Sequence, residues 1–246
     1  MGIDGIEIRG IENEMYAPRI RVFDDENREA TLARLHRADI VLTQLTSGAS
    51  LGMPEGPDAA SQEVRDYVDM AAKLGVPYVR AMISPHPGPE PVDIHQAKEL
   101  YLSLCDYAKG KGVYVLIETN GMLADSKVME EFMQGTDPAC SGVLWDIHHP
   151  YRYCGERPEY TFDRLGRYIK NTHIKDSVLK NGMVEYRMMG YGDVPVMDAL
   201  KTLDQAGYDG FITLEWVKRW NQELQEPGIV FYHYGSYMEY LMEQLR

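Results

Sequence analysis

Hydrophobic positions along this chain follow two alternating patterns. Short runs of mainly apolar residues, such as 113–118, are typical of strands buried in a sheet, and turn-forming residues bound them. Between these runs lie stretches whose apolar positions recur every three or four residues, the period of an amphipathic helix. The pattern predicts strands at 2–9, 40–43, 78–83, 113–118, 142–149, 169–174 and 211–215. It predicts helices at 24–37, 59–73, 92–108, 126–133, 161–168, 196–205 and 228–245.

Strands that alternate with helices predict βαβ units and a parallel sheet. Seven such units around one core favour an α/β protein with a (β/α) TIM-type barrel over an open doubly wound sheet. No G-x-G-x-x-G sequence follows any predicted strand, which argues against a dinucleotide-binding domain. The length suits one barrel, so we expect residues 1–246 to form a single domain.

The first predicted strand lacks a helix before it. The sequence Gly2-Ile-Asp-Gly5 resembles Gly207-Tyr-Asp-Gly210, which joins a predicted helix to a strand. We therefore expect an incomplete barrel of about seven parallel strands that lacks the first βα unit. Two strand edges would be exposed unless a partner chain or a rearranged segment covers them. Residues 179–195 interrupt the βα pattern and are predicted to form an inserted hairpin that turns at Asn181-Gly182.

Composition narrows the classes of partner. A formal net charge of −13 and a pI near 5.0 argue against binding to nucleic acid, which requires a basic surface. The three cysteines show no C-x-x-C spacing, which predicts reduced thiols in a cytoplasmic protein. No stretch approaches the roughly 18 apolar residues of a membrane-spanning helix, so no membrane association is expected.

Four polar residues stand at or just before the carboxyl ends of successive predicted strands: Glu118, Asp146, His173 and Glu215. Barrel enzymes carry their chemistry at this face, so we expect the four side chains to converge. Three carboxylates beside one imidazole would repel one another without a cation. They predict a site for one divalent metal ion, with Mn²⁺, Mg²⁺ or Co²⁺ favoured and Zn²⁺ as a further candidate.

Several motifs in order along the chain resemble the xylose isomerase-like TIM barrels, a superfamily that includes sugar and sugar-phosphate isomerases and epimerases. The resemblance implies that the same four residues bind the metal. In ketose 3-epimerases of this type, residues matching Glu118 and Glu215 remove and return a proton beside the carbonyl, through a cis-enediolate. Members of this superfamily also begin with a strand and helix that this sequence lacks. The motifs are Ile117-Glu-Thr-Asn-Gly121, Leu144-Trp-Asp-Ile-His-His149, His173-Ile-Lys-Asp176, Gly190-Tyr-Gly-Asp-Val-Pro195, and Gly207-Tyr-Asp-Gly with Leu214-Glu-Trp216.

Three further residues are candidates for binding the substrate. His149 follows Asp146 by three residues, where the superfamily often has a substrate-contacting histidine. Strand alternation would point the adjacent His148 to the opposite face. Lys175 is a candidate for substrate contact or for a local ion pair, and Arg187, in the predicted insertion, for clamping a phosphate or carboxylate.

The leading functional hypothesis is a metal-dependent isomerase or epimerase acting on a sugar or sugar phosphate through an enediolate. A metal-dependent lyase, such as a dehydratase of a cyclic polyol, begins with the same proton abstraction and stays open. A further open alternative is a non-catalytic binding protein that has lost the first βα unit but kept the metal-binding residues. An AP endonuclease fits poorly, because Tyr186-Arg187 stands where that resemblance requires an Arg-His pair. The exposed strand edges and the tyrosine-rich C-terminal helix favour a homo-oligomer.

Overall fold

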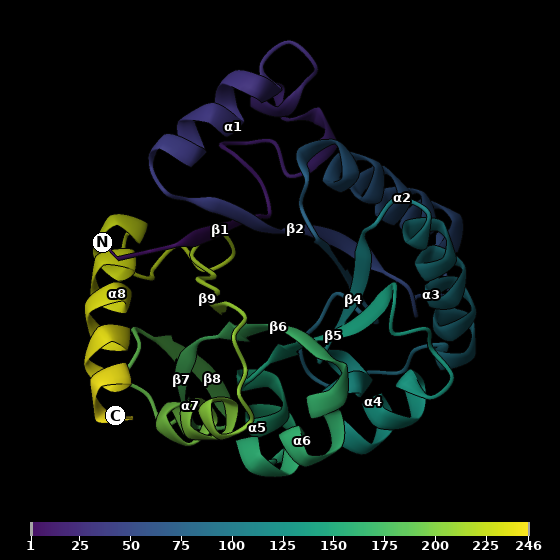
Figure 1. Cartoon of the computed structure of the whole chain (residues 1–246). Coiled ribbons are helices and arrows are strands. Elements are labelled where there is room, and N and C mark those ends of the chain that lie inside the picture. The colour runs from purple at the N-terminus through teal and green to yellow at the C-terminus, as the bar shows by residue number, and fades with distance from the viewer. Residues whose placement is uncertain (1, 246) are drawn as a thin grey trace.

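Seven parallel strands curl into a nearly closed barrel with helices around the outside (Figure 1). The computed structural model describes residues 2–245. The predicted (β/α) barrel of seven parallel strands is confirmed. The strands, in their order around the barrel, are β1 (Gly5–Ile8), β2 (Val41–Ser50), β3 (Tyr78–Met82), β4 (Tyr114–Glu118), β5 (Ser141–Asp146), β6 (Ile169–Ile174) and β9 (Ile212–Leu214).

The outer layer consists of helices that connect successive strands, as the apolar periodicity predicts. In the second of these, Pro57 occupies the first turn, and Gly75 ends the helix with a φ of 69° that favours glycine. None of the described helices is long and apolar enough to cross a membrane. The helices are α1 (Arg28–Arg37), α2 (Pro57–Leu74), α3 (Ile94–Lys109), α4 (Ser126–Met133), α5 (His148–Cys154), α6 (Pro158–Leu165), α7 (Val196–Gln205) and α8 (Pro227–Gln244).

The barrel has one seam, between β1 and β9. Within residues 2–245, β1 pairs only with β2 and β9 only with β6, so no backbone hydrogen bond crosses the seam. Side chains bring the two edges together: a Cβ atom on Gly5 would lie 3.0 Å from the ring of Phe211. The loops that follow these strands are also joined, because Arg219 donates a hydrogen bond to the carbonyl of Glu12 at 2.8 Å. Within the described residues, contacts that involve side chains therefore span the seam in place of a backbone ladder.

The chain leaves β5 differently from the prediction. The sequence predicted a strand as far as His149, whereas the strand ends at Asp146 and the two histidines open helix α5. Oδ1 of Asp146 accepts hydrogen bonds from the backbone N–H groups of His148 at 3.0 Å and His149 at 3.2 Å, which turns the chain into the helix. The prediction that strand alternation separates the two histidines is therefore wrong.

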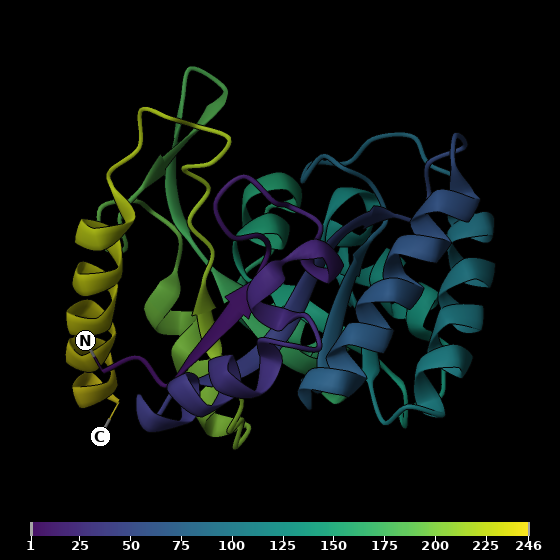
Figure 2. The same ribbon diagram turned by 90° about the horizontal axis from the view of Figure 1, so that it is seen from above.

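The predicted insertion forms an antiparallel hairpin of β7 (Asp176–Lys180) and β8 (Met183–Arg187). It turns at Asn181 and Gly182, whose φ values of 52° and 78° suit a tight two-residue turn. Figure 2 shows the hairpin projecting away from the barrel, on the side where β9 and α8 lie.

Candidate active site

The four residues at the strand ends form one cluster. Glu118 ends β4, Asp146 ends β5, His173 lies near the end of β6 and Glu215 directly follows β9. One ligand atom from each lies within 4.8 Å of those from the other three. The first three are almost completely buried, while the side chain of Glu215 is 23% exposed. The cluster therefore reaches solvent beside Glu215.

His173 presents an unpartnered nitrogen to the cluster. Its Nε2 lies 2.7 Å from Oε2 of Glu7 on β1, a contact in which Nε2–H donates to the carboxylate. Its Nδ1 is buried without a hydrogen-bond partner and lies 3.9 Å from carboxylate oxygens of Glu118 and Glu215. A carboxylate behind an imidazole whose other nitrogen is free is the usual arrangement around a metal-binding histidine.

The surroundings also govern the proton on His173. Burial lowers its pKa, but the carboxylates of Glu7, Glu215 and Glu118 outweigh burial and raise the pKa to about 9. Without a metal ion, Nδ1 therefore carries a proton at neutral pH.

Two cations pair with the carboxylates. Arg80 on β3 lies 3.1 Å from Oε2 of Glu118 and 3.4 Å from Oε1 of Glu215, and it also donates to the carbonyl of Ser47. Lys175, just after β6, pairs with Asp146 and Glu215. Both cations are buried beside the cluster.

The pKa values of Glu118 and Glu215 are shifted in opposite directions. Burial is the main cause that raises the pKa of Glu118; Arg80 opposes it and the charge of Glu215 reinforces it. Burial would also raise the pKa of Glu215, but Lys175, His173 and Arg80 hold it well below its usual range. The environment thus raises the pKa of one glutamate and lowers that of the other.

The donor set and charge of the cluster fit a divalent cation. Four carboxylates, those of Glu7 and of the three acidic cluster residues, face two permanent cations, Arg80 and Lys175. With a neutral His173, two negative charges remain, the charge that one divalent ion neutralises. Three carboxylate oxygens and one imidazole nitrogen suit Mg²⁺, Mn²⁺, Co²⁺ or Zn²⁺.

A family profile described as the xylose isomerase-like TIM barrel matches residues 1–230. The chain belongs to this family. The fructoselysine 3-epimerase of Escherichia coli O157:H7 is 26% identical over 237 residues, which cover 91% of this chain and 84% of that protein. This relative is thus named as an epimerase, at low identity to this chain.

Two solved structures share the family fold. A xylose isomerase-like TIM barrel protein from Mycobacterium smegmatis in complex with magnesium has a TM-score of 0.74 and 15% identity. The match covers 99% of this chain and 84% of that one. The D-psicose 3-epimerase with D-tagatose from Clostridium cellulolyticum H10 has a TM-score of 0.69 and 19% identity, covering 87% of this chain and 75% of that one. At these identities the two structures support the fold alone.

Of the three predicted substrate-binding residues, His149 and Lys175 lie beside the cluster and Arg187 does not. His149 donates from Nδ1 to the carbonyl of Thr119 at 3.1 Å, and its Nε2 lies 3.6 Å from Oδ2 of Asp146. Burial and then the charge of Lys175 hold the pKa of His149 well below its usual range, so the ring is neutral. Arg187 is not brought into the cluster, because it lies on the hairpin, 38% exposed, and pairs with Glu185.

Sequence reasoning missed Arg80 and Glu7, both of which point into the barrel. Each carried a detectable signal, namely a charged residue in the middle of an apolar strand. Such a residue is buried at a cost that only partners can offset, so its presence indicates an interior polar site. The partners themselves come from strands distant in sequence and were not apparent.

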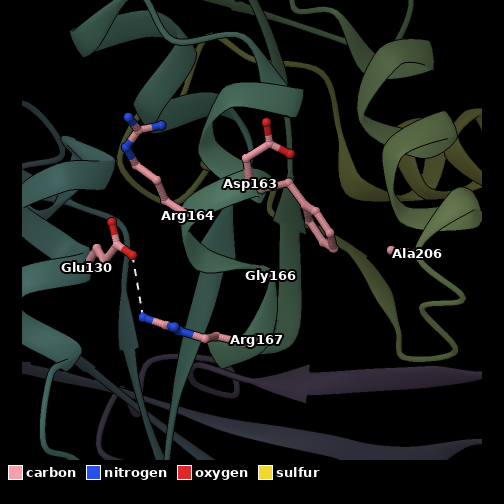
Figure 3. A pocket seen from close by; sticks show the side chains of 7 residues that line it. Glu130, Asp163, Arg164, Gly166, Arg167 and Ala206 are labelled. Atoms are coloured by element: carbon pink, nitrogen blue, oxygen red, sulfur yellow. Dashed lines mark hydrogen bonds and ion pairs between the residues drawn. The ribbon is translucent and has the colours of Figure 1, made fainter.

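A separate hollow lies on the helical exterior, away from the cluster (Figure 3). It has a volume of about 450 Å³ and is lined by residues of α4, of α6, of the 3-10 turn between α6 and β6, and by Ala206 directly after α7. Glu130, Asp163 and Arg167 are among them. Arg167 and Glu130 form an ion pair across it at 3.4 Å. It contains none of the strand-end residues, so the charged cluster is the stronger candidate for the active site of this family member.

Proposed function

We propose that this protein is a metal-dependent isomerase or epimerase that acts on a sugar or sugar phosphate. The reaction removes a proton from the carbon beside a carbonyl, passes through an enediolate and returns a proton. The observation that carries this proposal is one cluster in which Glu118 and Glu215, with opposite proton affinities, lie beside the unpartnered Nδ1 of His173. The epimerase activity named for the relative from E. coli supports the same reaction class.

The metal ligands in this proposal are Glu118, Asp146, His173 and Glu215. When bound, a divalent ion would supply Lewis-acid stabilisation of the negative charge on the enediolate oxygens. Mn²⁺, Mg²⁺ and Co²⁺ are the favoured ions, and Zn²⁺ is an alternative. The magnesium complex of the similar M. smegmatis protein supports a hard divalent ion in this fold.

The two glutamates divide the proton transfers. Glu215, held ionised by Lys175, is the proposed base for the first proton. Glu118, whose pKa is raised by burial, is the proposed donor of the second. Because the reaction is reversible, the roles exchange for the opposite epimer.

His149 and Lys175 are the proposed contacts to substrate oxygens. The neutral His149 directs Nε2 toward the cluster, and Lys175 carries a buried positive charge beside it. Arg187 stays a proposed clamp for an anionic substrate group, a role that requires its ion pair with Glu185 to open.

The test is exchange of carbon-bound protons in D₂O with Mn²⁺ present. The substrates are D-psicose, D-tagatose, fructoselysine, ketose phosphates and inososes. Deuterium incorporation with an epimeric or isomeric product is expected for at least one of the sugars. Exchange and loss of water from an inosose alone would replace the proposal with a lyase, and absence of exchange with every compound would refute it.

A further inference from the structure

The side chain of Glu7 lies where β1 meets the rest of the barrel interior. It is 7% exposed, although it is charged and belongs to a strand that pairs on one side only. Two strands supply its partners. Oε2 accepts from Gln44 on β2 at 2.9 Å, and Oε1 accepts from Asn171 on β6 at 2.8 Å.

The contact with His173 links this network to the cluster. Oε2 of Glu7 lies 2.7 Å from Nε2 of His173, so the ring keeps a proton on Nε2 and turns Nδ1 toward Glu118 and Glu215. Asn171 and His173 both belong to β6, on the far side of the seam from β1. Glu7 therefore links the edge strand β1 to β6, the strand that pairs with the other edge, β9, across a seam that no backbone hydrogen bond joins.

We propose that Glu7 is a positioning residue that couples closure of the β1–β9 seam to metal binding by His173. The inference rests on the proposed metal site. Glu7 holds the imidazole in the orientation that points Nδ1 at Glu118 and Glu215, so that this nitrogen can take the ion once its proton is lost. In return, an ion held by Nδ1 in place of its proton would fix the ring in the orientation that keeps Nε2–H on Glu7, and so hold the bond that docks β1.

This coupling is reciprocal by thermodynamic linkage. Whatever free energy the docked strand adds to metal binding, the metal adds to docking of the strand. A purely structural Glu7 would have another signature: its loss would lower stability equally with and without metal. The two roles are therefore separable by measuring metal affinity and local opening together.

The experiment compares wild type, Glu7→Gln and Glu63→Gln in titrations with Mn²⁺ by calorimetry. Glu7→Gln keeps the size of the side chain and removes its charge. Glu63 is a matched control, because its carboxylate accepts from the N–H of Gly48 at 2.6 Å and does not belong to the cluster. We expect Glu7→Gln to weaken Mn²⁺ binding by about 10- to 100-fold and Glu63→Gln to leave it unchanged.

Hydrogen–deuterium exchange in the same three proteins gives the second readout. Mn²⁺ should slow exchange of the backbone amides of residues 5–9 and 212–214 in wild type and in Glu63→Gln. In Glu7→Gln, Mn²⁺ should not slow exchange at these amides. Should Glu7→Gln fail to fold, Glu7→Asp, which keeps the charge on a shorter side chain, takes its place with a smaller expected loss.

The outcomes separate the inference from the proposed function. If wild type binds no Mn²⁺, the metal site is wrong and this inference falls with it. If wild type binds Mn²⁺ and Glu7→Gln binds it equally well, only the role of Glu7 is refuted. Unchanged exchange at β1 and β9 when wild type binds Mn²⁺ would refute the coupling as well.

Discussion

At the scale of single residues, the environment of each carboxylate decides its chemistry. Glu118 and Glu215 are the same residue type at equivalent strand ends, yet their pKa values move in opposite directions. The difference arises because Lys175 pairs with Glu215 and not with Glu118. A pair of like groups with divided proton affinity is the arrangement that acid–base catalysis requires.

Replacing either glutamate tests this division. Glu215→Gln and Glu118→Gln should each lower kcat/KM for the epimerised sugar by about 10²- to 10⁴-fold, the usual contribution of a positioned acid or base. Deuterium exchange in single turnovers should distinguish them, because loss of the first base abolishes exchange. Glu63→Gln should retain wild-type rates, and retention of full activity in either cluster variant would contradict the assignment.

His173 predicts a pH dependence for the metal-free protein. Its pKa in the folded state, about 9, lies above the value of 6.5 expected after unfolding. The stabilisation is therefore present in full below pH 6.5 and is lost as pH rises through about 9. At about 1.4 kcal/mol per unit of pKa, the loss is about 3 kcal/mol. Urea unfolding in EDTA between pH 6 and 9.5 measures this loss. If the free energy of unfolding of His173→Gln falls as steeply with pH as that of wild type, another group is responsible.

At the scale of elements, Asp176 organises the segment after the hairpin. It follows His173 by three residues, and its carboxylate accepts hydrogen bonds from the N–H groups of Gly190 at 2.9 Å, Gly192 at 2.8 Å and Val194 at 3.2 Å. The loop that returns from β8 is thus tied to the strand-end that carries a cluster residue.

Glycine is required where this loop approaches Asp176. A Cβ atom on Gly192 would lie 2.0 Å from Oδ1 of Asp176 and 2.4 Å from the carbonyl of Ser177. We expect Gly192→Ala to lower the free energy of unfolding by about 1–3 kcal/mol, because loop and strand must separate. Gly228→Ala is the control, since no heavy atom lies within 4 Å of its Cβ position. Equal midpoints of urea unfolding for the two variants would contradict the close approach.

At the scale of the whole molecule, the cluster gathers strands from both halves of the chain. Its residues lie at the ends of β4, β5 and β6 and directly after β9, and Glu7 adds β1. An ion that binds all four ligands should therefore stabilise the entire barrel. The predicted homo-oligomer stays a prediction, which light scattering would test.

Metal removal tests this stabilisation. At a Mn²⁺ concentration of 100 times Kd, the folded state gains about 2.7 kcal/mol, which raises Tm by several degrees in a protein of this size. Calorimetry with EDTA and with Mn²⁺ measures the shift. Asp146→Asn, which keeps an oxygen for the N–H groups of α5 but loses the charge, should abolish most of it. A wild-type Tm that is the same in both solutions would contradict the metal site.

The sequence by itself determined the order of the elements and the four residues of the cluster. Period-two and period-3.6 patterns are local properties, and the carboxyl ends of parallel strands in a barrel share one face. Glu118, Asp146, His173 and Glu215 could therefore be grouped without coordinates. The hairpin turn at Asn181-Gly182 was equally readable, because these residues adopt positive φ with little strain.

Only the tertiary structure decided the partners of those residues. Arg80 and Glu7 meet the cluster from strands that are far away in sequence, through barrel curvature and register that no local pattern encodes. The short helix α5 directly after β5 was not predicted, and it begins at His148 because the carboxylate of Asp146 accepts its N–H groups. The direction in which the hairpin projects depends on packing of the whole chain, not on the turn between its two strands. This direction keeps Arg187 away from the cluster, and Arg187 pairs instead with Glu185.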